Sequence, residues 1–267
     1  MEKTPFIFLK KGVAMGRLEI FRFWFVILIF AFWILNFEFA YATPSTTYWT
    51  PCTSDIQAYK RWHITYDSYF TVDKKGTEKG DFPTDVGLTV GVLPFEKLNL
   101  EVGFDILQPT DDPLYFNAKL GFPENSLFEG SPALNIGIFN VGTKKGVTNY
   151  NILDFIAGKT LPFNFGRIHL GYYVGLGEDD SGIKTLRSSS GKEDNDGFMI
   201  GYDKYIYKDK IMFAADWAFG KNAIGGGGFG LYYFFTPDID LLTGPVWFED
   251  QGLNGNWKWT LQLDINF

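Results

Sequence analysis

The chain has 267 residues, with 24 lysines and arginines against 31 aspartates and glutamates, which gives a formal net charge of −7. This acidic balance argues against a nucleic-acid partner, because phosphate binding needs a basic surface. Cys52 is the only cysteine, so the chain can form neither an internal disulfide nor a cysteine metal cluster.

The first 42 residues predict a secretory signal peptide. Five lysines and arginines precede an uninterrupted apolar run of 13 residues, 23–35. That run is too short to cross a hydrocarbon core, which needs about 20 apolar residues. Ala40 and Ala42 form a small-x-small site, so we expect export through the inner membrane and cleavage after Ala42. The alternative is an uncleaved membrane anchor.

Residues 43–60 lie between the signal peptide and the first predicted strand. They contain Pro44, Pro51 and Cys52 and show no strand alternation. We expect a periplasmic N-terminal lead-in. The alternative is a short plug that folds into the interior of the domain formed by residues 61–267.

Residues 61–267 consist of short segments with a two-residue period, separated by clusters of Gly, Pro, Asn and Asp. The clearest segment is the last, in which apolar and polar residues alternate without interruption from Trp257 to Phe267. Alternation of this kind predicts strands with one apolar and one polar face. The twelve predicted ranges are 61–71, 84–93, 97–107, 113–122, 133–141, 150–160, 167–177, 197–207, 210–219, 228–235, 240–248 and 257–267.

The number of apolar faces indicates how these strands are arranged. A soluble sandwich would bury the faces against each other, whereas a transmembrane barrel turns them toward lipid and leaves no open edge. Twelve such faces favour an all-β, antiparallel transmembrane β-barrel. Weak alternation at 133–141 and 240–248 leaves ten to fourteen strands open.

The predicted connections alternate between short turns and longer outer loops, as a barrel requires. One exception is 123–132, which has ten residues where a short periplasmic turn is expected. The longest connection, 178–196, is polar and predicts a mobile solvated loop. It is alternatively a candidate for surface binding or for narrowing a pore.

The C-terminal segment resembles the terminal strand of bacterial outer-membrane β-barrel proteins. The resemblance rests on the alternating apolar residues of that strand and its final phenylalanine: Leu261, Leu263, Ile265 and Phe267. In that group such a strand is the insertion signal for the barrel assembly machinery. The resemblance implies a location in the cell outer membrane, in contact with its lipid, and implies no particular activity.

Strand parity assigns ten charged residues to the barrel interior, and acids predominate among them. Arg61 and Arg167, near strand starts, are further basic candidates. The ten are Asp67, Asp85, Glu101, Asp105, Lys119, Asp154, Asp203, Asp216, Lys258 and Asp264.

This acidic interior predicts a narrow, cation-preferring channel for small solutes, because charged rings inside a low-dielectric wall attract ions of opposite sign. The alternative is a filled, non-conducting barrel with an envelope-structural or surface-interaction role, since small barrels can be filled by side chains.

The sequence offers no convincing catalytic constellation. The two histidines, His63 and His169, face the interior by parity, and strand register places no serine beside either one. We therefore expect neither an enzyme, nor a cofactor, nor a metal site.

Overall fold

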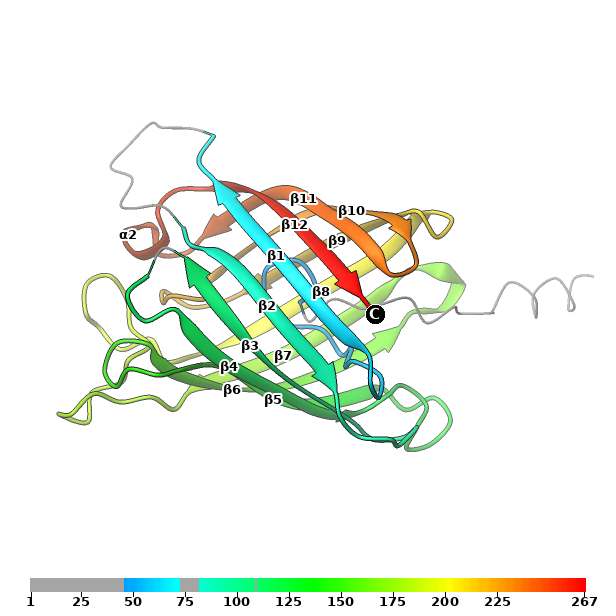
Figure 1. Cartoon of the computed structure of the whole chain (residues 1–267), viewed down its shortest axis with the longest axis horizontal. Helices are drawn as coiled ribbons and strands as arrows, with labels where there is room; N and C mark the ends of the chain where they lie inside the picture. Colours follow the sequence, from blue (N-terminus) through cyan, green and yellow to red (C-terminus); the bar gives the residue numbers. More distant parts are fainter. Residues whose placement is uncertain (1–45, 73–81, 109) are drawn as a thin grey trace, which may run out of the picture. The chain divides into compact units, whose positions relative to one another are not determined.

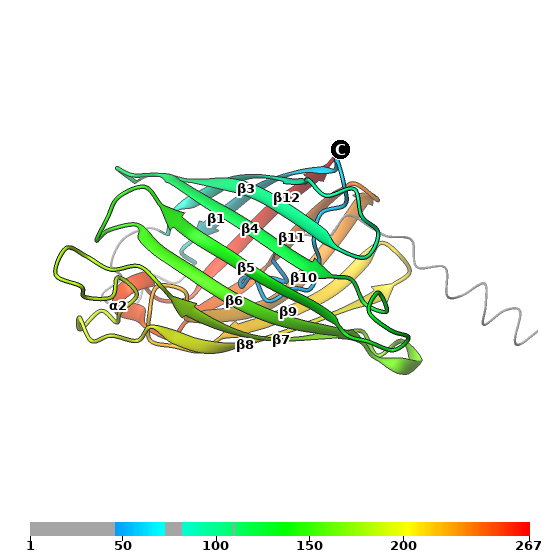
Figure 2. The same ribbon diagram turned by 90° about the horizontal axis from the view of Figure 1, so that it is seen from below.

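The computed structural model describes residues 46–72, 82–108 and 110–267, and the predicted signal peptide with its cleavage site lies outside these ranges. The chain forms a closed barrel in which each strand pairs with its sequence neighbour and β1 pairs with β12 (Figures 1 and 2). All twelve pairings are antiparallel. The prediction of an all-β antiparallel barrel with twelve strands is confirmed.

The strands begin and end within a few residues of the predicted ranges. They are β1 Trp62–Phe70, β2 Thr84–Gly91, β3 Asn99–Gln108, β4 Leu114–Phe122, β5 Ala133–Gly142, β6 Asn149–Thr160, β7 Arg167–Gly175, β8 Asp196–Tyr207, β9 Ile211–Ala218, β10 Gly226–Thr236, β11 Ile239–Phe248 and β12 Lys258–Asn266. Two short helical turns, η1 Pro162–Asn164 and α2 Gln251–Asn254, lie in connections. Among the described residues no helix is both long and apolar enough to span a membrane.

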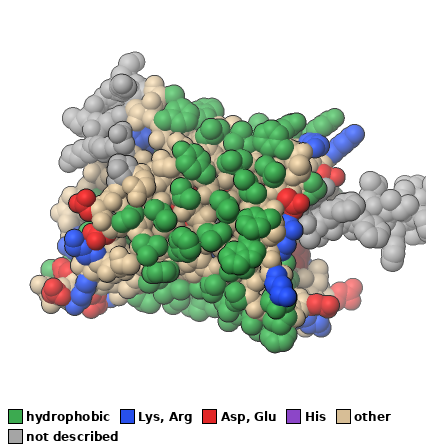
Figure 3. All heavy atoms as spheres, viewed as in Figure 1, with side chains coloured by type: hydrophobic (Ala, Val, Ile, Leu, Met, Phe, Trp, Pro, Cys, Tyr) green, Lys and Arg blue, Asp and Glu red, His purple; other side chains and the backbone are tan. Residues whose placement is uncertain are grey.

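Apolar side chains point outward around the wall. Ile136, Phe155, Leu170 and Ile200 are each at least 39% exposed, although they lie within strands. The face seen in Figure 3 carries hydrophobic side chains across the wall, with charged side chains gathered toward the two ends. Exposing such a surface to water would cost about 25 cal/mol of free energy per Å² of apolar area.

The connections at one end are short, and those at the other end include the longest loop and α2 (Figure 1). The ten-residue connection 123–132 lies at the short end, and hydrogen bonds within it hold it compact: the amides of Asn125 and Ser131 donate to the carbonyls of Ser131 and Phe128, at 3.1 and 2.9 Å. Further bonds tie it to the end of β6. Glu124 accepts bonds from the main-chain amide and the hydroxyl of Thr160, at 3.1 and 2.7 Å. Its other oxygen lies 2.7 Å from Nζ of Lys159. This connection therefore closes a hairpin despite its length.

Candidate functional site

The ten charged residues assigned to the interior all lie on the inward side of their strands. Glu101, Lys119, Asp154, Asp203, Asp216, Lys258 and Asp264 are buried, and Asp67, Asp85 and Asp105 are partly buried. Arg167 also points inward and binds interior carboxylates. Arg61 does not belong to the interior, because it precedes β1, is half-exposed and pairs with Asp238 at the end of the barrel.

Residues 46–60, here called the inner segment, run through the barrel interior. Asp216 on β9 holds its first turn: one carboxylate oxygen accepts the main-chain amides of Tyr48, Trp49 and Thr50 at 2.9, 2.8 and 2.8 Å. The side chain of Asp216 therefore fixes the path of the inner segment directly.

The ring of Tyr48 is fully buried against the β9–β11 side of the wall. Its hydroxyl donates to the carbonyl of Pro245 at 3.0 Å. Two glycines of β10 make room for the ring: a Cβ at Gly228 or Gly230 would lie 2.8 or 2.5 Å from its carbons. Gly228 and Gly230 thus form a cradle for Tyr48, which explains why neither position carries a side chain.

A second anchor lies near the start of β7. Arg167 binds both oxygens of Asp55, from the inner segment, at 2.7 Å, and both oxygens of Asp203 at 2.9 and 2.8 Å. A guanidinium forms two such forks at once because its donors are planar and fixed. This arrangement ties the inner segment to β7 and β8.

His169 belongs to the same anchor. Its Nε2 lies 3.2 Å from Asp203, and its Nδ1 accepts the main-chain amide of Ser54 at 3.1 Å. The expectation that no serine lies beside a histidine is therefore wrong, because strand register could not place the inner segment. The contact uses the amide of Ser54, and the other ring nitrogen faces Asp203 of β8, so both ring nitrogens have a partner.

Glu101 on β3 and Asn135 on β5 complete the attachment. Glu101 accepts the amide of Gln57 at 2.7 Å and lies 3.9 Å from Nζ of Lys119. Asn135 donates to the carbonyl of Thr53 at 3.2 Å. The inner segment is thus bonded to strands on several sides of the barrel.

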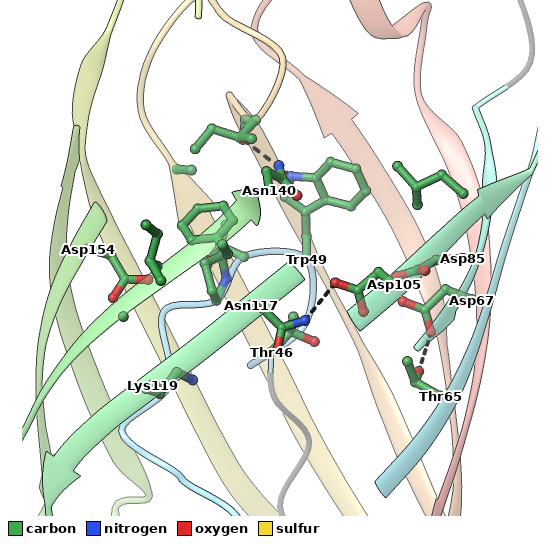
Figure 4. Close-up of a pocket in the computed structure, with 18 of the residues that line it drawn as sticks. Thr46, Trp49, Thr65, Asp67, Asp85, Asp105, Asn117, Lys119, Asn140 and Asp154 are labelled. Atoms are coloured by element: carbon green, nitrogen blue, oxygen red, sulfur yellow. Dashed lines mark hydrogen bonds between the residues drawn. The ribbon is translucent and has the colours of Figure 1, made fainter. Parts of the chain in front are cut away.

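A cavity of about 220 Å³ remains between the inner segment and the β1–β6 wall. Six carboxylates and one amine line it. Figure 4 labels the amine and four of the carboxylates, those of Asp67, Asp85, Asp105 and Asp154. The carboxylates are Asp67, Asp85, Glu101, Asp105, Asp154 and Asp264, and the amine is Lys119. Seven of the ten predicted interior residues therefore share one cavity, whereas Asp203, Asp216 and Lys258 lie elsewhere in the interior.

Strand parity missed one carboxylate on the inward side of the barrel wall. Asp240, at the start of β11, is fully buried and pairs across the strands with Asp264. Its neighbours on the inward face, Leu242 and Val246, are apolar because they pack around Tyr48. In the sequence, the inward residues of β11 are therefore mostly apolar, and strand parity does not identify them as interior. Their contact with the inner segment accounts for this.

The fold and the site together define a closed antiparallel β-barrel whose interior is partly filled by residues 46–60 of the same chain. No protein-family model and no curated protein matches the sequence. Among solved structures, the chain is similar to the KdgM porin, with 8% identity and a TM-score of 0.49 over 78% of this chain and 99% of that one. The NanC porin gives 12% identity and a TM-score of 0.45 over 78% and 98%. An outer-membrane channel from Pseudomonas putida F1 gives 14% identity and a TM-score of 0.44 over 85% of this chain and 100% of that one. At identities this low, the similarity concerns the fold and says nothing of a shared function.

Proposed function

We propose that the chain is an outer-membrane β-barrel that passes small cations through a narrow interior. The apolar outward face supports insertion of the barrel in lipid, because a barrel surrounded by water would need polar side chains on that face (Figure 3). The closed ring supports it further, because a bilayer leaves no solvent to satisfy an open strand edge.

The preference for cations is carried by one observation, the excess of six carboxylates over one amine around the interior cavity. A low-dielectric wall focuses the field of such charges along the path of a solute. An anion entering this space would meet carboxylates from several strands, and Lys119 already lies 3.9 Å from Glu101.

The inner segment acts as the constriction in this proposal. It is bonded to Asp216, to Arg167 and to Glu101, so it narrows the lumen without closing the cavity beside it. The same anchors favour a second candidate, a filled barrel with a structural or surface-interaction role. In that case the inner segment would be a permanent plug.

Export and insertion complete the proposal. Residues 1–42 would act as a cleaved signal peptide. The apolar side of β12, with Leu261, Leu263, Ile265 and Phe267, would be recognised by the barrel assembly machinery. Leu261 and Phe267 are 41% and 57% exposed on the outer surface, where such a partner could reach them.

The test is single-channel conductance of the exported protein in a planar bilayer with a salt gradient. We expect discrete steps and a cation-selective reversal potential. The double substitution Asp67→Asn with Asp105→Asn should reduce that selectivity, while the charge-matched pair Asp111→Asn with Asp209→Asn, in connections between strands, should not. Anion selectivity would overturn the cation preference, and a folded but silent barrel would favour the plug.

A further inference from the structure

The cavity beside the inner segment has an aromatic side. The ring centroid of Trp49 lies 5.4 Å from that of Tyr69 and 5.0 Å from that of Phe82, and all three residues line the cavity. Such a group offers an electron-rich surface to a cation, because aromatic rings attract positive charge over their faces. Trp49 is held in place by its indole nitrogen, which donates to the carbonyl of Ile224 at 3.4 Å.

Three carboxylates lie on one side of this aromatic group. Asp67 and Asp85 are directly opposite each other on β1 and β2, and Asp105 follows on β3. Like charges in opposite positions destabilise a sheet. Thr65 donates to Asp67 and Asn117 to Asp105, each at 2.8 Å, and among the described residues no lysine or arginine lies within ion-pair distance of the three.

A fourth carboxylate, Asp154 on β6, lies on the other side of Trp49 (Figure 4). It is 1% exposed and lines the cavity, and its Oδ1 accepts no hydrogen bond from the described residues. Asp85 also has an oxygen without such a donor. A buried carboxylate oxygen that lacks a donor is costly, and a bound cation with N–H groups would remove that cost.

The size and lining of the cavity indicate the class of ligand. At about 220 Å³ it is larger than the roughly 150 Å³ that accommodates benzene. Within the described residues no three acidic, histidine or cysteine side chains are grouped to hold a metal ion. Carboxylates on two sides with the ring of Trp49 between them (Figure 4) suit an organic cation whose ammonium groups are separated by an apolar chain.

We propose that this cavity is a binding site for a small organic cation carrying ammonium or guanidinium groups, with Asp85 and Asp154 as its carboxylate partners and Trp49 against its apolar part. The inference rests on the proposed function, in that the ligand would be a solute entering the acidic interior. It names the class of solute that the interior selects.

The test is calorimetric titration of the folded full chain in detergent, with 1,4-diaminobutane as the probe and 1,4-butanediol as its neutral counterpart. We expect saturable binding of the diamine and none of the diol. Asp85→Asn and Asp154→Asn should each weaken diamine binding about tenfold or more. Trp49→Leu should weaken it several-fold, while Asp209→Asn and the outward Trp62→Leu should leave it unchanged.

Folding of each variant is checked by heat-dependent migration on a gel, so that loss of binding by a folded variant is distinguished from misfolding. Absence of diamine binding to the folded wild-type chain would overturn the inference, even if the barrel conducts cations. Binding by a barrel that stays silent in bilayers would support the site and overturn the channel.

Discussion

At the residue scale, Asp216 is the side chain that accepts the most hydrogen bonds from the inner segment among the anchors. Three main-chain amides and the hydroxyl of Thr50 share its Oδ2. Asp216→Ala leaves those amides without an acceptor, at a cost of about 1–3 kcal/mol for each one that stays buried. We expect a loss on the order of 3 kcal/mol in the free energy of unfolding, measured by urea titration in detergent.

Asp216→Asn serves as the matched control, because an amide oxygen can still accept from the same donors. Asp216→Asn should lower the free energy of unfolding clearly less than Asp216→Ala does. Equal stability of the wild type and Asp216→Ala would mean that the inner segment contributes little to the fold.

Asp250 allows a pH-dependent contact to be predicted in the outer loops. Its carboxylate accepts the amide of Ser189 at 2.7 Å and the amide of Gly252 at 2.9 Å. Partial burial raises the pKa of Asp250, but these amides outweigh it and hold that pKa below its ordinary value. The contact therefore stabilises the loop above the unfolded pKa of about 3.9 and is lost as the pH falls through the lower folded value.

We expect hydrogen exchange at the Ser189 amide, corrected for the intrinsic effect of pH, to lose protection as the pH falls below about 4. Asp250→Asn should remove this pH dependence, since an amide does not titrate there. Protection that remains constant in the wild type over this range would show that another contact holds the loop.

At the element scale, the inner segment carries its own reporter. Cys52 is the only cysteine of the sequence and is fully buried in the interior. A charged thiol reagent should therefore leave the folded barrel unlabelled over times that fully label the unfolded chain. Arg167→Met breaks the fork to Asp55 and should raise the labelling rate at least about tenfold, as expected for charge-assisted bonds.

Lys159→Met is the control for this experiment, because Lys159 holds the connection 123–132 and does not contact the inner segment among the described residues. Rapid labelling of the folded wild type would mean that the inner segment leaves the interior readily. An inner segment that leaves the interior on this timescale would support the channel, with the segment as its gate. An inner segment that stays in the interior would support the filled barrel.

The elements also show how far the sequence predicts this molecule. Strands such as β3 and β12 were predictable because an apolar outward face and an acidic interior impose opposite demands on alternate residues. Asp240 was not predictable by the same rule, because Leu242 and Val246 face inward to pack on Tyr48. The path of residues 46–60 could not be predicted either, since its anchors, Asp216 and Arg167, are distant in sequence and no period connects them to it.

At the scale of the whole molecule, the decisive question is whether the outward face contacts hydrocarbon. Ile200 lies in the middle of β8 and is 40% exposed. If lipid surrounds the wall, Ile200→Arg should cost about 2–4 kcal/mol, because charge at the bilayer midplane is penalised. Leu253→Arg in α2, where the leucine is 37% exposed, should cost at most about 1 kcal/mol, as at an interface.

The measurement is reversible urea folding of both variants into lipid vesicles, followed by tryptophan fluorescence. Similar exposure of the two native side chains makes the comparison one of position rather than of burial. Equal costs at the two positions would contradict a transmembrane wall, and with it the argument that the cavity lies on a path across a membrane. A large difference would place β8 in lipid and α2 outside the hydrocarbon.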